Sequence, residues 1–197
     1  MTKKICLTFD DGPHEVFTPI ILDILKQYNI KATFFIVGDR VSDNKDIIKR
    51  IIDEGHDIGN HSYNHECFSK MTDQDVFDSI NNTNNILNKY FNYTIKYVRA
   101  PYGRSYRDER IVSIFKKLNL RHIFWNVDSR DWDKRNNCDV IIDNVLFGLN
   151  KSVMNKSIII FHDRNSNYEE NETMTIKALR KLIPILINKY QFVKLHE

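Results

Sequence analysis

The sequence predicts an α/β domain built on a parallel sheet, and three observations lead to that prediction. Short runs of β-branched and aromatic residues alternate with longer segments whose apolar residues recur every three or four positions. The chain has 197 residues, 42% of them hydrophobic, which is enough for one sizeable core. Parallel strands need crossover connections, and seven strands joined by helices are enough to curl toward a barrel.

The expected strands are justified by their composition, taken in order along the chain. The first two, "KICLTF" and "KATFFIV", and the sixth, "SIIIFH", are short runs rich in β-branched and aromatic residues. The others, "HDIGN", "IKYVRA", "RHIFWNV" and "QFVKL", are runs bounded by polar residues. Together the seven strands cover residues 4–9, 31–37, 56–60, 95–100, 121–127, 157–162 and 191–195.

The expected helices fill the intervals between these strands. Each carries apolar residues three and four apart, which places them on one face of a helix. The helices cover residues 18–28, 44–54, 73–91, 108–118, 138–149 and 175–190. Because no linker or low-complexity segment interrupts the series, we expect one domain over residues 1–197.

Composition excludes several classes of partner. Twenty-nine basic and 26 acidic residues are interspersed and give a net charge of +3, which argues against nucleic acid. No apolar stretch is long enough to cross a bilayer, and the first apolar run is too short for a signal peptide. We therefore expect a monomer that is cytoplasmic as written, or extracellular if a leader is omitted. The three widely spaced cysteines are interpreted as free thiols.

The stretch "TFDDGPH" places two carboxylates, Asp10 and Asp11, side by side at the end of the first expected strand. Adjacent like charges disfavour each other's ionisation, so such a pair costs stability. A nearby cation, or a different chemical role for each carboxylate, would explain why the pair is present. Successive side chains of an extended strand point to opposite sides, so the two could serve different tasks. A plain Asp-Gly-Pro turn is the alternative.

Ionisable residues stand at the ends of five expected strands. In parallel βα architectures catalytic groups gather at this carboxyl edge of the sheet. We therefore expect these residues to share one rim of the molecule. They are Asp10 and Asp11, His61 and His65, Arg99, Asp128 and Asp131, and His162 and Asp163.

The stretch "HSYNH" carries His61 and His65, two imidazoles four residues apart. They can converge on one metal if the segment turns helically, and one carboxylate would complete a site that keeps coordination positions open for water. Alone, this spacing is also common among surface histidines. Paired with "FDD" it becomes a stronger indication of a metal site.

Five ordered motifs carry a resemblance to a known family. They are "TFDDGP" (8–13), "HSYNH" (61–65), "RAPYG" (99–103), "DSRDW" (128–132) and "IIIFHD" (158–163). They resemble the motifs of the polysaccharide deacetylase family, the NodB homology domain of carbohydrate esterase family four. The resemblance runs from residue 4 to about the C-terminus. It implies a distorted (β/α) barrel of about seven parallel strands.

The resemblance also implies an activity, the metal-assisted removal of acetyl groups from chitin-like sugars, peptidoglycan or xylan. The partner would be an acetylated glycan, with N-acetylglucosamine units of chitin-like oligomers or cell-wall glycan as the first choice. Acetylated xylan, or a non-sugar amide hydrolysed on the same fold, is the alternative. An inactive barrel that only binds carbohydrate would be favoured if a motif residue were missing, and none is.

Roles follow from the resemblance, motif by motif. Asp11, His61 and His65 would hold a divalent metal, Zn²⁺ or another ion such as Co²⁺. Asp10 would be the general base, and His162 would be the acid that protonates the departing amine. This division suits amide hydrolysis, which needs an activated water, a grip on the carbonyl oxygen and a proton for the leaving nitrogen.

The remaining motif residues would support these groups. Arg99 would pair with Asp10 and Asp131 with His162, although a surface ion pair and a plain loop residue are the alternatives. The backbone N–H of Tyr102 would help to stabilise the oxyanion. Trp132 would line a sugar-stacking groove or belong to the core, and Ile160 would lie beside the acetyl pocket.

Overall fold

The structure is a computed structural model, and it describes residues 2–103, 107–164, 168–169 and 172–197. The strands of the main sheet are β1 (Lys4–Gly12), β2 (Thr33–Ile36), β3 (Asp57–Asn60), β4 (Tyr97–Val98), β5 (Arg121–His122), β6 (Val127–Asp128), β7 (Lys156–His162) and β10 (Gln191–Phe192). The helices are α1 (Phe17–Gln27), α2 (Lys45–Asp53), α3 (Asp73–Phe91), α4 (Glu109–Lys117), α5 (Cys138–Lys151) and α6 (Met174–Leu186). Short 3₁₀ turns are η1 (Gly38–Arg40), η2 (Phe68–Lys70) and η3 (Pro101–Gly103).

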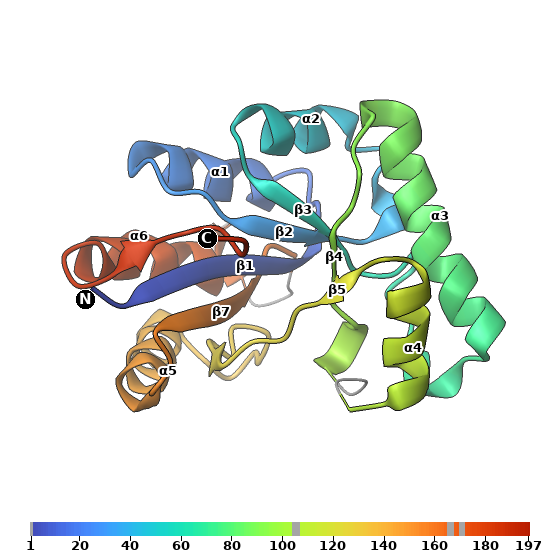
Figure 1. Cartoon of the computed structure of the whole chain (residues 1–197). Coiled ribbons are helices and arrows are strands. Elements are labelled where there is room, and N and C mark those ends of the chain that lie inside the picture. The colour runs from blue at the N-terminus through green and yellow to red at the C-terminus, as the bar shows by residue number, and fades with distance from the viewer. Residues whose placement is uncertain (1, 104–106, 165–167, 170–171) are drawn as a thin grey trace.

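The main sheet is parallel throughout and has the order β5-β4-β3-β2-β1-β7-β6, with β10 paired to the start of β1. It curls into an open, distorted barrel with the helices on its outer side (Figure 1). The central strands β1 and β7 pair from Lys4 opposite Lys156 to Asp10 opposite His162. This register places Asp10 and His162, which belong to different motifs, opposite each other at the carboxyl edge of the sheet.

The two faces of β1 show how the core divides. Ile5, Leu7 and Phe9 belong to the large apolar cluster beneath the helices, while Cys6 belongs to a small cluster inside the barrel. Alternation of side chains along the strand produces this division. Burial raises the pKa of the Cys6 thiol to about 11, so it is an inert packing group. The three cysteines are free, as expected.

The helices begin within a residue of where the apolar spacing predicts, and polar side chains cap the N-termini of α3, α4, α5 and α6. Thr72 caps α3, Asp108 caps α4, Asn137 caps α5 and Thr173 caps α6, each through a side-chain oxygen that accepts a backbone N–H. Asn92 ends α3 in a left-handed conformation. None of the described helices is long and apolar enough to cross a membrane.

The prediction of one strand over residues 121–127 is wrong. This run forms two short strands, β5 and β6, at opposite edges of the sheet. Just after β5, Ile123 N–H donates to the Val98 carbonyl of β4. Just before β6, Asn126 N–H donates to the Ile158 carbonyl of β7. The chain therefore crosses the opening of the barrel between residues 123 and 126. The carbonyl of Ile123 accepts a hydrogen bond from Arg99 Nε, which replaces a strand-to-strand bond. A small antiparallel hairpin, β8 (Tyr168–Glu169) with β9 (Glu172–Thr173), was not predicted.

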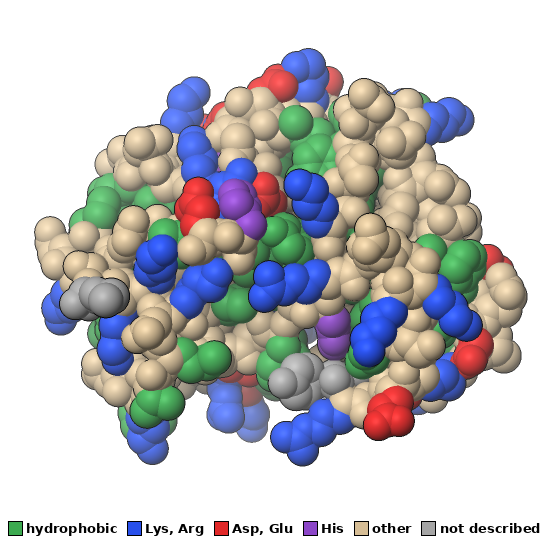
Figure 2. Space-filling view, viewed as in Figure 1, with side chains coloured by type: hydrophobic (Ala, Val, Ile, Leu, Met, Phe, Trp, Pro, Cys, Tyr) green, Lys and Arg blue, Asp and Glu red, His purple; other side chains and the backbone are tan. Residues whose placement is uncertain are grey.

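Charged side chains are dispersed on the face shown in Figure 2. Lys and Arg side chains lie over much of this face, with uncharged surface and acidic side chains between them. In the middle of this face several Lys and Arg side chains lie close to one another, and acidic side chains are fewer.

Candidate active site

Asp10 and Asp11 lie at the carboxyl end of β1, where the strand is irregular. The pairing register with β2 shifts between Asp10 and Gly12, and Asp11 has a left-handed backbone with φ of 74°. Simple alternation along an extended strand, which the sequence suggested, is therefore not what separates the two carboxylates. The bulge at Asp11 aims its side chain, as bulges near active sites often do.

His61 and His65 follow β3, but the segment between them does not form the helical turn on which the sequence argument depended. It is a loop in which Ser62 and His65 have positive φ angles of 68° and 61°. Asn60 holds this loop, because its side-chain oxygen accepts the Ser62 N–H and its amide donates to the Ile80 carbonyl of α3. Two left-handed residues achieve the convergence that a helix would have given.

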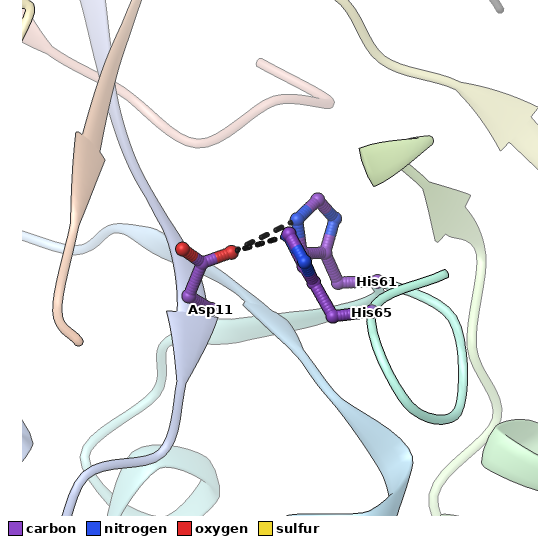
Figure 3. A group of neighbouring side chains, drawn as sticks. All are labelled: Asp11, His61 and His65. Atoms are coloured by element: carbon purple, nitrogen blue, oxygen red, sulfur yellow. Dashed lines mark ion pairs between the residues drawn. The ribbon is translucent and has the colours of Figure 1, made fainter. Parts of the chain in front are cut away.

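Asp11, His61 and His65 meet at one point, where the two imidazoles from the β3 loop face the carboxylate from β1 (Figure 3). Oδ1 of Asp11 lies 3.2 Å from Nε2 of His61 and 3.0 Å from Nε2 of His65. Burial acts to raise the pKa of Asp11, but the two imidazoles outweigh it and hold that pKa well below its usual range. The carboxylate is therefore ionised.

The donor set fits a divalent metal. Nδ1 of His61 lies 2.8 Å from the backbone carbonyl of Arg99, and because a carbonyl can only accept, this nitrogen carries the proton. With Nδ1 turned to that carbonyl, Nε2 is the ring nitrogen of His61 that faces Asp11. One carboxylate and two imidazoles are the ligands of many catalytic metal sites, and an outer hydrogen bond of this kind fixes the tautomer. The structure therefore contains a possible metal site.

Asp10 is buried beside this group and is paired with Arg99. Nη1 of Arg99 donates to Oδ1 of Asp10 at 2.7 Å and to the Thr8 hydroxyl at 2.8 Å. Burial lowers the pKa of Arg99, and Asp10 opposes that effect. The guanidinium also lies 4.2 Å from the ring centre of Phe35. The other oxygen of Asp10 faces His61, with Oδ2 at 3.8 Å from Nε2.

His162 and Asp131 form a second pair at the end of β7. Nδ1 of His162 lies 2.7 Å from Oδ1 of Asp131, and the backbone N–H of His162 donates to Oδ2 at 2.8 Å. The Thr175 hydroxyl of α6 also donates to Oδ2, at 2.7 Å. Burial acts to lower the pKa of His162, but the charge of Asp131 outweighs it and raises that pKa to about 10.

Three further predicted residues lie at or near this edge. Tyr102 has a left-handed backbone, and its exposed ring lies edge-on to His65 with 4.8 Å between the ring centres. Trp132 follows the buried Asp131 and is 55% exposed, so it is not a core residue. Ile160 is buried on β7, opposite Thr8 of β1 and two residues before His162.

The structure thus brings together the motif residues from separate strand ends, and the chain can be compared with known proteins on that basis. The family model described as polysaccharide deacetylase matches residues 1–129. The chain belongs to the polysaccharide deacetylase family. Both the family and the fold class predicted from the sequence are therefore confirmed.

Relatives in this family differ in the glycan that their names state. The chain is 38% identical to a peptidoglycan-N-acetylglucosamine deacetylase of Bacillus cereus over 186 residues, 94% of this chain and 64% of the relative. It is 35% identical to a chitooligosaccharide deacetylase of Sinorhizobium fredii, covering 93% of this chain and 85% of the relative. The chain therefore spans slightly less than two thirds of the Bacillus cereus relative's length.

A solved structure supports the same relationship. The crystal structure of a peptidoglycan N-acetylglucosamine deacetylase superposes with a TM-score of 0.86 at 37% identity, covering 98% of this chain and 86% of that chain. The two chains therefore share the same fold.

Several residues that hold the site were not predicted from the sequence. Thr8 accepts a hydrogen bond from Arg99, and Thr175 donates one to Asp131. The ring centre of Trp125 lies 5.5 Å from the guanidinium carbon of Arg99. For a threonine within a strand or a helix, no residue spacing in the sequence predicts such a contact. Thr8 could have been suspected, because it lies two residues before Asp10 and so points to the same side of the strand.

Proposed function

We propose that this chain removes acetyl groups from N-acetylglucosamine units of a glycan, either peptidoglycan or a chitin-like oligomer, with a divalent metal. The observation that carries the proposal is the convergence of Asp11, His61 and His65 beside the Asp10–Arg99 pair, with His162 on the neighbouring strand. The names of the relatives, which include both kinds of glycan, support this substrate class.

In this proposal Asp11, His61 and His65 hold the metal, and zinc is the ion that this ligand set suits best. When bound, the metal supplies polarisation of the acetyl carbonyl and acidifies the attacking water. We assign the remaining steps to side chains and backbone groups of the chain itself.

Asp10 is the general base. Arg99 occupies its Oδ1, so Oδ2, which faces His61, is the oxygen available to a water. This oxygen accepts one proton as the water attacks the carbonyl carbon. The backbone N–H of Tyr102 is assigned to the developing oxyanion, and its left-handed conformation sets the direction of that group.

His162 is the general acid. Asp131 stabilises its cationic form and orients the ring through Nδ1, so Nε2 is the nitrogen that donates. As the carbon–nitrogen bond breaks, this proton passes to the departing amine, and acetate and the free amino sugar are the products. Trp132 offers an exposed ring face to a neighbouring sugar, and Ile160 is assigned to the acetyl pocket.

Acetate release from a panel of substrates tests the proposal. We expect acetate from chitin oligosaccharides or peptidoglycan with the zinc-loaded parent, and none from either with Asp10→Asn at matched zinc content. Release from acetylated xylan alone would replace N-deacetylation by O-deacetylation. Hydrolysis of a simple acetanilide without any glycan activity would indicate a non-sugar amide, and an inert zinc-loaded parent would indicate an inactive barrel.

A further inference from the structure

Asp163 is a buried carboxylate next to the site that the proposed reaction does not use. It directly follows His162 at the end of β7 and is completely buried. Its Oδ2 accepts a hydrogen bond from the Thr18 hydroxyl at 2.6 Å, and its Oδ1 is buried without a hydrogen-bond partner among the described residues. Burying a carboxylate with so few donors is costly, so a structural reason for its presence should be visible.

Thr18 connects Asp163 to the turn that follows Asp11. The Thr18 hydroxyl accepts the backbone N–H of His14 at 2.8 Å, while the Thr18 N–H donates to the His14 carbonyl at 3.2 Å. The hydroxyl therefore bridges the carboxylate on β7 and the backbone just after β1. Displacing the Asp163 side chain would remove the hydrogen bond that connects that turn to the end of β7.

Gly12 makes the second contact. A Cβ atom at Gly12 would lie 2.1 Å from Oδ2 of Asp163 and 2.4 Å from Oδ1, so the carboxylate rests directly against the glycine. Gly12 does not have a positive φ, which means that it is needed for space and not for its backbone conformation. The Asp163 side chain fills the place that any other residue's Cβ would take.

The contact lies at the bulge that aims Asp11. On the other side, the Arg40 guanidinium donates to the Asp11 carbonyl, and Val37 N–H donates to the Gly12 carbonyl at 2.9 Å. Asp163 N–H donates to the Asp10 carbonyl at 3.2 Å, so the ends of β1 and β7 are joined here by backbone as well as by side chain. Contacts from both sides therefore fix the bulge, and Asp163 makes the contacts at the end of β7.

We propose that Asp163 is a positioning residue that fixes the Asp11 bulge against β7, and so sets both metal affinity and the placement of the metal relative to His162. The inference rests on the proposed function only in taking Asp11 as a metal ligand. Because residues 162 and 163 are consecutive, the same strand end places the proton donor and supports the ligand. The shape of the Asp163 side chain and its hydrogen bond from Thr18 position the bulge, and the negative charge of the carboxylate is not needed for this.

Zinc affinity, measured by competition with a chromophoric chelator, tests this directly. Asp163→Ala should weaken zinc binding by about 10-fold or more, the size of effect seen when outer support of a ligand is lost. Asp163→Asn keeps the shape and an oxygen for Thr18, so it should bind zinc much as the parent does. A loss in Asp163→Asn equal to that in Asp163→Ala would overturn the proposal.

Gly12→Ala provides a test specific to the contact. Its methyl group meets the Asp163 carboxylate and should weaken zinc binding, whereas Asp163→Ala makes room for that methyl group. The double variant should therefore bind zinc no worse than Asp163→Ala alone, and additive losses would contradict the proposed contact. Gly148→Ala is the matched control. A Cβ atom at Gly148 of α5 would lie 2.9 Å from Val127 of β6, so the variant should change thermal stability without changing zinc affinity.

A further pair keeps the test valid if Asp163→Ala does not fold. Thr18→Val removes the hydroxyl and should weaken zinc binding, and Thr18→Ser should restore it. Equal affinity in these two variants would overturn the proposal. A parent that neither binds zinc nor releases acetate would refute the proposed function, whereas an active, zinc-binding parent with an unaffected Asp163→Ala variant would refute only this inference.

Discussion

Asp11 and Asp131 are both carboxylates at the carboxyl edge of the sheet, but their surroundings differ. We call Asp11, His61 and His65 the metal side of the site, and Asp131, His162 and Thr175 the acid side. On the acid side, three donors satisfy Asp131 within the chain. On the metal side, Oδ1 of Asp11 faces two imidazole nitrogens at 3.2 and 3.0 Å, a donor set that fits a divalent cation.

Under the proposed function, the difference separates a half of the site that is complete within the chain from a half that would bind an ion. The acid side is a complete hydrogen-bonded unit whose geometry is set by α6, β7 and the 128–132 loop. The metal side is a set of possible ligands held in place by backbone irregularities, and in the proposed function a divalent ion completes it. The two sides should therefore respond differently to the same kinds of change.

The largest expected effect is loss of the metal. Asp11→Asn should lose zinc and with it all turnover, as should treatment of the parent with a strong chelator, and added zinc or cobalt should restore only the parent. His162→Ala should keep its zinc and lose roughly 10²- to 10⁴-fold in turnover, the range for a lost general acid. Elemental analysis beside acetate-release rates measures both. Retention of zinc by Asp11→Asn would remove the distinction between the two sides.

A second prediction uses His56, a buried imidazole without a close carboxylate partner of the kind that His162 has. Burial and the charge of Lys31 lower its pKa from 6.5 to about 4, and its Nδ1 accepts the Ala32 N–H. His56 stays neutral in the folded state, whereas the unfolded chain takes up a proton below about pH 6.5. The contribution of His56 to the free energy of unfolding should therefore fall by about 3 kcal/mol as pH drops from 6.5 to 4, and level off below.

The His56→Asn variant tests this, because its amide oxygen can replace Nδ1 as the acceptor. Urea unfolding of parent and variant at several pH values between 4 and 7 should show a smaller loss of stability in the variant. The pKa of His122 is also lowered to about 4 by burial, but its contribution is common to both proteins and cancels. Identical pH dependence in the two proteins would show that His56 is not held neutral.

A third prediction sharpens the comparison on the acid side. Asp131→Asn removes the charge that raises the pKa of His162 to about 10, so that pKa should fall. A general acid is active only below its pKa, so the alkaline limb of the turnover profile should move to lower pH, with roughly a 10-fold loss near neutrality. Turnover measured from pH 6 to 10 reports this. An unmoved alkaline limb would mean that another group sets it.

The smallest effect is expected at Thr175. Thr175→Val removes one donor from the buried Asp131 Oδ2, which keeps the His162 N–H, so the free energy of unfolding should drop by about 1 kcal/mol. Zinc affinity should not change, because Thr175 supports only the acid side. Thr175→Ser, which keeps the hydroxyl, is the control. Equal stability of the two variants would show that the Thr175 bond contributes nothing.

Much of the fold could be read from the sequence, because its evidence is local. All six predicted helices lie within a few residues of their observed ends, since each prediction depends on apolar spacing within one segment. The run 121–127 was misread because its residues favour a strand equally well on either side of the break. Only the positions of β4 and β7 decide that the segment crosses between two edges.

The sequence by itself determined the types of group at the site and the strand ends that carry them, because those follow from motif chemistry and the alternation of strands with helices. Tertiary structure alone decided how the groups converge. The bulge at Asp11 and the left-handed backbone of Ser62 and His65 replaced the regular strand and helical turn that the sequence suggested. Such irregularities depend on contacts between distant segments, as between Asp163 and Gly12, and no spacing within one segment records them.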